Sequence, residues 1–152
     1  MAWLELKVPP PFVLFILAGI MWLDDRILGG GLVAGAPLFL GLILMAAGFG
    51  LAFTGLRTLI SNSTTPSPSQ IERARKLVTS GLYQFTRNPM YLGMVIFLVG
   101  VAAVFGNAWL LIEPGVFVAY ITRFQIEPEE RMLAAKFGAD YVSYQKRVRR
   151  WI

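Results

Sequence analysis

Residues with side chains capable of chemistry gather in two short stretches of this sequence. In the first, residues 79–93, a glycine lies two positions before a tyrosine, and an arginine lies two positions before a proline. In the second, Glu129 and Glu130 follow Pro128. The chain has no cysteine and no histidine, so it lacks a thiolate nucleophile and the commonest general base. Carboxylate, tyrosine, lysine and arginine side chains must therefore carry any reaction.

The first stretch combines a turn with the start of a helix. Gly81 permits a tight turn that exposes backbone N–H and C=O groups, and Tyr83 offers a ring face with a hydroxyl. Arg87 is a permanent planar cation that can orient an anionic group. Pro89 favours a first helical position and disfavours helix at Asn88, so a helix is predicted to begin at Pro89. Simpler interpretations are an interfacial anchor for Tyr83 and a lipid-phosphate contact for Arg87.

The surrounding sequence is strongly apolar. Hydrophobic residues make up 56% of the chain and charged residues 15%, which is typical of a membrane protein rather than of a soluble domain. In that setting the net charge of +5 indicates contact with anionic lipid headgroups rather than nucleic-acid binding. No nucleic-acid partner is therefore expected.

The apolar runs predict an all-α fold, a polytopic membrane helix bundle forming a single domain over residues 1–152. The first run has the length of a signal peptide, but no small-x-small cleavage pattern follows it, and prolines at positions 9–11 favour a helix start. Gly106 and Asn107 divide the last run into a helical hairpin. The four expected spans are residues 10–24, 29–56, 89–105 and 108–124. The expected cytosolic loop is residues 57–88, and the expected cytosolic C-terminal segment is residues 125–152.

The distribution of charge predicts how the bundle is oriented. Basic residues concentrate between residues 57 and 87 and again from Arg123 onward, whereas the loop Asp24, Asp25 and Arg26 is net acidic. The positive-inside rule then predicts that both termini lie in the cytoplasm. The expected location of the chain is the inner membrane of a prokaryote. Aromatic and basic residues alternate from residue 141 to 152, which is typical of a helix lying at the headgroup level.

Together the two stretches resemble the isoprenylcysteine carboxyl methyltransferase and phospholipid methyltransferase superfamily. The resemblance covers about residues 60–152 and rests on residues 77–83, Arg87-x-Pro89-x-Tyr91-x-Gly93 and the glutamate pair. It implies an integral membrane enzyme that uses S-adenosylmethionine. Members that methylate prenylated cysteine usually carry histidine at the position of Asn88, so their substrate does not follow from the resemblance.

The resemblance also implies roles for single residues. Glu130 is expected to position the acceptor or to close a salt link to Arg87, and these two are the catalytic candidates. Either Arg123 or Gln125 stands in the place of a substrate-facing arginine, with Gln125 aligning more directly. No metal site is expected. The residues expected to bind the cofactor are Lys76, Leu77, Val78, Gly81, Tyr83, Asn88, Pro89, Tyr91 and Glu129.

The expected function is methyl transfer from S-adenosylmethionine to a lipophilic small molecule or lipid that enters from the bilayer. A carboxylate acceptor needs no base, whereas an amine must lose one proton, for which Glu130 or Tyr83 would serve. Two alternatives stay open. One is a nicotinamide-dependent membrane reductase of the sterol-reductase type, which two adjacent carboxylates disfavour because that cofactor is rich in phosphate. The other is a non-enzymatic membrane scaffold with the same fold.

Overall fold

A computed structural model describes residues 4–28, 30–62 and 76–152. Within these residues the chain is all-helical and contains no strand, which confirms the predicted all-α class. The middle of the expected cytosolic loop, residues 63–75, lies outside the described residues. The elements in chain order are α1 (Pro10–Ile27), α2 (Ala36–Ser61), the 3-10 helix η3 (Gly81–Gln84), α3 (Pro89–Phe105), the 3-10 helix η4 (Ala108–Leu111), α4 (Ile112–Ile121), the π-helical turn η5 (Thr122–Ile126), α5 (Glu127–Phe137) and α6 (Ala139–Arg147).

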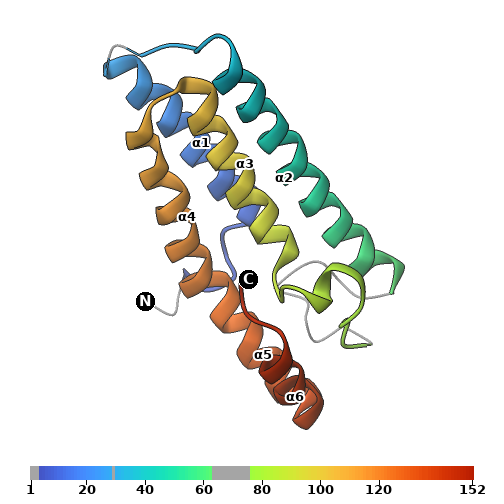
Figure 1. Ribbon diagram of the computed structural model, residues 1–152. Coiled ribbons are helices and arrows are strands. Elements are labelled where there is room, and N and C mark those ends of the chain that lie inside the picture. The colour runs from blue at the N-terminus through green and yellow to red at the C-terminus, as the bar shows by residue number, and fades with distance from the viewer. Residues whose placement is uncertain (1–3, 29, 63–75) are drawn as a thin grey trace.

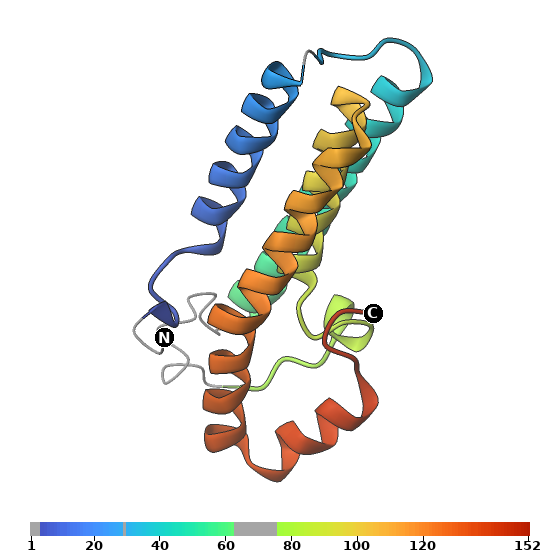
Figure 2. The ribbon, with the colours of Figure 1, turned by 90° about the vertical axis from the view of Figure 1, so that its left-hand side faces the viewer.

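The helices α1 to α4 run in alternating directions and form one elongated bundle (Figure 1). α3 contacts α1, α2 and α4 and therefore lies at the centre of the bundle. α5 and α6 form a V-shaped pair that projects from one end (Figure 2). Both described chain ends lie there, since the backbone N–H of Leu6 donates to Phe124 and that of Arg87 donates to Arg149. We call this the polar end; it comprises residues 4–8, 76–91 and 122–152.

Proline and glycine residues set some of the helix boundaries, and other boundaries differ from the predicted ones. α3 covers the predicted range because Pro89 is its first residue and Gly106 ends it in the left-handed conformation, with φ +67°. α2 begins at Ala36 rather than at residue 29, since Gly35 precedes it with φ +76° and a proline follows in its first turn. It then continues to Ser61, beyond the expected end at residue 56.

The helix that contains the last predicted span continues beyond residue 124. α4, η5 and α5 follow one another without a break as far as Phe137, so the helix leaves the bundle and enters the polar end. Pro128 has no N–H to give to the carbonyl of Phe124, four residues earlier. That carbonyl accepts from the backbone N–H of Leu6 at 3.0 Å instead, which lets the helix continue through the proline.

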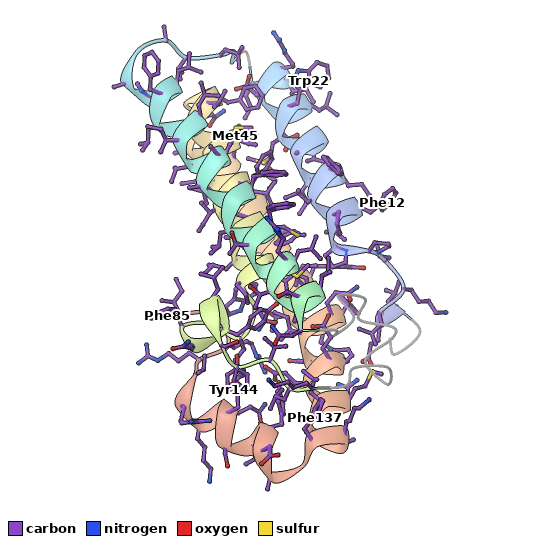
Figure 3. The ribbon with its side chains drawn as sticks, turned by 90° about the vertical axis from the view of Figure 1, so that its right-hand side faces the viewer. Phe12, Trp22, Met45, Phe85, Phe137 and Tyr144 are labelled. Atoms are coloured by element: carbon purple, nitrogen blue, oxygen red, sulfur yellow. The ribbon has the colours of Figure 1, made fainter. Side chains whose placement is uncertain are left out.

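By length and apolar composition, α2 could cross a membrane, and α3 is a shorter apolar helix. Large apolar side chains of α1 point outward, among them Phe12 and Trp22 (Figure 3), and Phe49 of α2 is also exposed. The inner faces of α1, α3 and α4 pack into one core around Met21, Leu98 and Phe117, which are fully buried. An apolar exterior around an apolar core suits a bilayer.

A second apolar cluster lies in the polar end. Tyr141, Tyr144 and Val148 are buried there against Leu77, Phe137 and two neighbours on α5. Figure 3 shows Tyr144 and Phe137 pointing into this cluster. The aromatic face of α6 is thus packed inside the protein, against α5. The position of α6 at the headgroup level stays a prediction.

α2 and α3 approach each other closely through glycines. Gly41, Gly48 and Gly55 lie seven residues apart on α2 and face α3. A β-carbon added at Gly48 would lie 2.5 Å from the carbonyl oxygen of Gly93. One added at Gly100 would lie 2.7 Å from the carbonyl oxygen of Gly41. Small residues allow backbones to meet in this way in membrane helix pairs.

Gly48→Ala is expected to lower the free energy of unfolding by about 1–3 kcal/mol, the usual effect of overpacking a close contact. Gly50→Ala is the matched control, because Gly50 lies on the same helix with open space around its Cα. The control should lose no stability and should gain about 0.5–1 kcal/mol, because alanine is the better helix former. Denaturation by sodium dodecyl sulfate in mixed micelles measures both. Equal losses in the two variants would contradict the tight α2–α3 packing.

Candidate functional site

The two chemistry-bearing stretches come together at the polar end. The first stretch supplies η3 and the start of α3, and the second supplies the first turn of α5. A third segment, from α6 to the C-terminus, lies against both of them: Tyr144 donates to the carbonyl of Tyr83 in the first stretch, and Arg150 donates to Glu130 in the second. The site is therefore built from three segments.

Glu129 is paired with a tyrosine. Its Oε1 accepts a hydrogen bond of 2.5 Å from the hydroxyl of Tyr91, a buried residue in the first turn of α3. Burial raises the pKa of Glu129 to about 7; the bond from Tyr91 acts in the opposite direction, and the charge of Glu130 adds to the rise. A cation placed beside this carboxylate would favour its ionised form, because the attraction between the two charges would offset the cost of removing the carboxylate from water.

Glu130 is an anion held between two arginines. Its Oε1 accepts from Nη2 of Arg87 at 2.7 Å and from Nε of Arg150 at 3.0 Å, and its Oε2 accepts from Nη2 of Arg150 at 2.7 Å. Burial opposes its ionisation, but the hydrogen bonds from Arg150 and Arg87 outweigh burial and lower the pKa of Glu130. The salt link to Arg87 suggested by the sequence is present. A carboxylate held in this way is a weak base.

Arg87 is engaged on most of its donors. Besides the bond to Glu130, its Nη1 donates to the carbonyls of Gln145 at 3.2 Å and Val148 at 3.0 Å. Its Nε is buried and has no hydrogen-bond partner. The guanidinium thus fastens the C-terminal segment to the start of α3.

Gly81 and Tyr83 form the turn that the sequence predicted. Gly81 begins η3 with φ +62°, a conformation that favours glycine. Tyr83 is buried, and its carbonyl accepts from the hydroxyl of Tyr144 at 2.7 Å. Burial, with the nearby Tyr144 and Glu129, raises the pKa of Tyr83 above its ordinary value. Its phenol therefore stays protonated at neutral pH and is unsuited to act as a base.

The other residues of the first stretch have mixed environments. Val78 is buried, Leu77 packs against the Tyr141 and Tyr144 cluster, and Lys76 is exposed. Asn88 is buried in the corner before α3, where Nδ2 donates to the carbonyl of Arg150 at 2.9 Å. Its backbone N–H donates to Oγ1 of Thr86 at 3.1 Å. Pro89, also buried, begins α3. Asn88 thus serves the contact with the C-terminal segment.

Arg123 and Gln125 both contact the N-terminal segment. Nη1 of Arg123 donates to Glu5 at 3.1 Å and to Glu127 at 3.3 Å, on an exposed surface. Gln125 is buried; Nε2 donates to the carbonyl of Val8 at 2.7 Å, and Oε1 has no partner. Their predicted role in binding the acceptor stays a prediction. If Arg123 binds an anionic acceptor, Glu5 competes with that acceptor for the guanidinium of Arg123.

Comparison with known proteins identifies the family. The chain matches the family described as phospholipid methyltransferase over residues 36–140, which is more than half of its length. The chain belongs to the phospholipid methyltransferase family. The match includes the turn at Gly81, the start of α3 and the glutamate pair on α5. The resemblance to the wider superfamily with isoprenylcysteine methyltransferases is thereby confirmed.

Curated relatives of this phospholipid methyltransferase family member include named enzymes. Protein-S-isoprenylcysteine O-methyltransferase B of Arabidopsis thaliana is 34% identical over 108 residues, which is 71% of this chain and 55% of the relative. The mouse protein-S-isoprenylcysteine O-methyltransferase is 31% identical over 71% of this chain and 38% of its own length. An uncharacterized protein of Haemophilus influenzae is 36% identical over 41% of this chain and all of the relative.

The chain spans about half of the Arabidopsis methyltransferase and less of the mouse one. No solved structure matches it. The family and the names of these relatives support methyl transfer and do not favour the reductase. Within the described residues, no group of three or more carboxylate side chains could hold a metal ion.

Sequence reasoning did not single out Arg150 or Thr86 in the candidate site of this family member. Arg150 lies in a basic run with Lys146, Arg147 and Arg149, and nothing in the run distinguishes it. The spacing of Tyr141 and Tyr144 indicated only a shared helical face. These residues meet their partners only because α6 folds back beside α5 (Figure 2).

Proposed function

We propose that this protein transfers a methyl group from S-adenosylmethionine to a lipophilic acceptor at the polar end. The observation that carries the proposal is the Tyr91–Glu129 pair, in which a cationic ligand would stabilise the half-buried carboxylate of Glu129. It lies beside Glu130, which the two arginines hold in place. Membership of a methyltransferase family supports the same reaction.

The residues present suit S-adenosylmethionine. Glu129 would face a positively charged group of this cofactor, and the unpartnered Nε–H of Arg87 would meet a carboxylate. Lys76, Leu77, Val78, Gly81 and Tyr83 would line the nucleoside, with Asn88, Pro89 and Tyr91 closing the site. When bound, the cofactor supplies a methyl carbon that its sulfonium already activates.

The chain's own residues would align the reactants and exclude water rather than perform strong acid–base chemistry. We propose that Arg87 orients an anionic group through Nε–H, and that Glu130 acts by holding Arg87. A carboxylate acceptor needs nothing more. For an amine acceptor, Glu129 is a better proton acceptor than Glu130 or Tyr83, because its pKa of about 7 lies near neutral pH.

The acceptor's nature is proposed from the bundle and from the named relatives. The Arabidopsis and mouse proteins are named for methylating isoprenylcysteine, which joins a carboxylate to an apolar chain. We propose an acceptor of that kind, with its apolar part in lipid and its head at the corner before α3. The glycine contacts hold α2 and α3 tightly together. An acceptor that enters from lipid would therefore use the other side of α3, where α1 contacts α3 and α4.

We also propose that α1 to α4 cross the inner membrane of a prokaryote as four spans, with both termini in the cytoplasm. The alternating directions of the four helices support an even number of crossings. The basic residues Arg87, Arg123 and Arg131 lie at the polar end, while Asp24 and Asp25 lie at the far end of α1. This distribution agrees with the positive-inside rule.

Purified protein is expected to bind S-adenosylmethionine and S-adenosylhomocysteine in preference to NADPH, because a carboxylate such as Glu129 suits a cationic ligand better than a phosphate-rich one. Isothermal titration calorimetry in detergent, with the three ligands at equal concentration, measures this preference. Tight binding of NADPH without a response to either adenosyl compound would favour the reductase. Binding of none of them would favour the scaffold.

A further inference from the structure

We propose that Arg150 is a positioning residue that holds the two halves of the methyl-transfer site together, an inference that rests on the proposed function. One half is the corner formed by residues 86–88, which carries Arg87 and begins α3. The other half is the first turn of α5, which carries Glu129 and Glu130. Arg150 contacts both halves, through its backbone and through its side chain.

The side chain of Arg150 binds the α5 half. Its Nε and Nη2 donate to the two oxygens of Glu130 at 3.0 Å and 2.7 Å, a two-point contact with a fixed geometry. Side-chain exposure is 12% for Glu130 and 35% for Arg150, so this pair is shielded from water more than a surface pair is. A lysine at this position could keep the charge but not the two-point contact.

The backbone of Arg150 binds the corner. Its carbonyl accepts from Nδ2 of Asn88 at 2.9 Å and from Oγ1 of Thr86 at 3.3 Å. Next to it, the carbonyl of Arg149 accepts from the backbone N–H of Arg87 at 3.0 Å. The last residues of the chain therefore lie along the corner as a strap, and the side chain of Arg150 ties this strap to α5.

Cofactor binding would depend on this connection. Arg87 and Asn88 stand on the corner, whereas Glu129 stands on α5, so a ligand that contacts all three needs the two halves at a constant separation. Arg87 by itself already joins the two halves, because its Nη2 lies 2.7 Å from Oε1 of Glu130. Arg150 adds a second connection and restricts rotation about the first. It need not touch the ligand to affect binding.

The test compares Arg150→Ala with Arg149→Ala. Arg149 carries the same charge one residue earlier, and its side chain is exposed, with a single 3.5 Å contact to the C-terminal Ile152. Arg150→Ala is expected to raise the dissociation constant for S-adenosylhomocysteine about 10- to 100-fold, the range for losing charge-assisted hydrogen bonds. Arg149→Ala should stay within about twofold of the wild type, and Arg150→Lys should lie between the two.

A second measurement needs no ligand. Hydrogen exchange followed by mass spectrometry should show faster exchange in Arg150→Ala at residues 86–88 and 148–152, with the core of α3 and α4 unchanged. A dissociation constant equal to that of Arg149→Ala, or faster exchange throughout the chain, would overturn the positioning role. If the wild type itself fails to bind S-adenosylhomocysteine, the proposed function is wrong and the inference falls with it, whatever the exchange pattern is.

Discussion

Glu129→Gln is expected to weaken binding of S-adenosylmethionine by about 1–3 kcal/mol, or about 5- to 150-fold, while leaving the protein folded. Glutamine keeps the size of the side chain and can still accept from Tyr91, but it removes the charge that faces the cationic ligand. Titration calorimetry in detergent measures the change. Glu127→Gln is the control, since Glu127 lies two residues earlier and pairs with exposed Arg123. Similar small effects in both variants would mean that Glu129 is not at the cofactor.

The same carboxylate should make binding depend on pH. The pKa of Glu129 is raised from 4.5 to about 7, so below about pH 7 the folded protein holds a proton that must leave before a cation binds. Affinity for S-adenosylmethionine should therefore fall as the pH is lowered from about 8 to about 6. In the protein without ligand, the raised pKa affects folding in the opposite direction. The contribution of Glu129 to the free energy of unfolding falls as the pH rises from 4.5 through about 7. Glu129→Gln should remove both dependences.

Arg87→Met is expected to lower the free energy of unfolding by about 3–5 kcal/mol, the range for removing one partner of a buried ion pair. The change leaves Glu130 with Arg150 alone and deprives the carbonyls of Gln145 and Val148 of their donor. Denaturation in mixed micelles, followed by circular dichroism, measures the loss.

The control for this variant is Arg123→Met. Arg123 also has two acidic neighbours, Glu5 and Glu127, but its side chain is 49% exposed against 11% for Arg87. An exposed pair contributes only about 0–1 kcal/mol. If the two variants lost the same stability, the ion pair of Arg87 would be as weak as one on the surface, and its part in fastening the C-terminal segment would be wrong.

Features set by neighbouring residues could be predicted from the sequence. The range of α3 follows from Pro89 and Gly106, and the turn at Gly81 follows from its freedom to take a positive φ. The salt link from Arg87 to Glu130 was predictable because the resemblance placed both in one site. The glycine seam was partly predictable, since Gly41, Gly48 and Gly55 repeat every seven residues while Gly50 does not share that spacing.

Features set by tertiary contacts could not be predicted in this way. Arg149 and Arg150 are indistinguishable in sequence, and only the fold of α6 beside α5 selects Arg150 as the partner of Glu130. The continuation of α4 into α5 was missed because Pro128 normally interrupts a helix. It is tolerated because the N-terminal segment donates to the carbonyl of Phe124, a partner more than a hundred residues away in the chain.

The π-helical turn at residues 122–126 sets the rotational phase of everything after it. Such a turn holds one residue more than an α-helical turn, and one residue corresponds to about 100° around the helix axis. Glu129 and Glu130 therefore face Tyr91 and Arg87 because of one additional residue. A single deletion in this segment would therefore turn both glutamates away from their partners, even if every side chain of the site were kept.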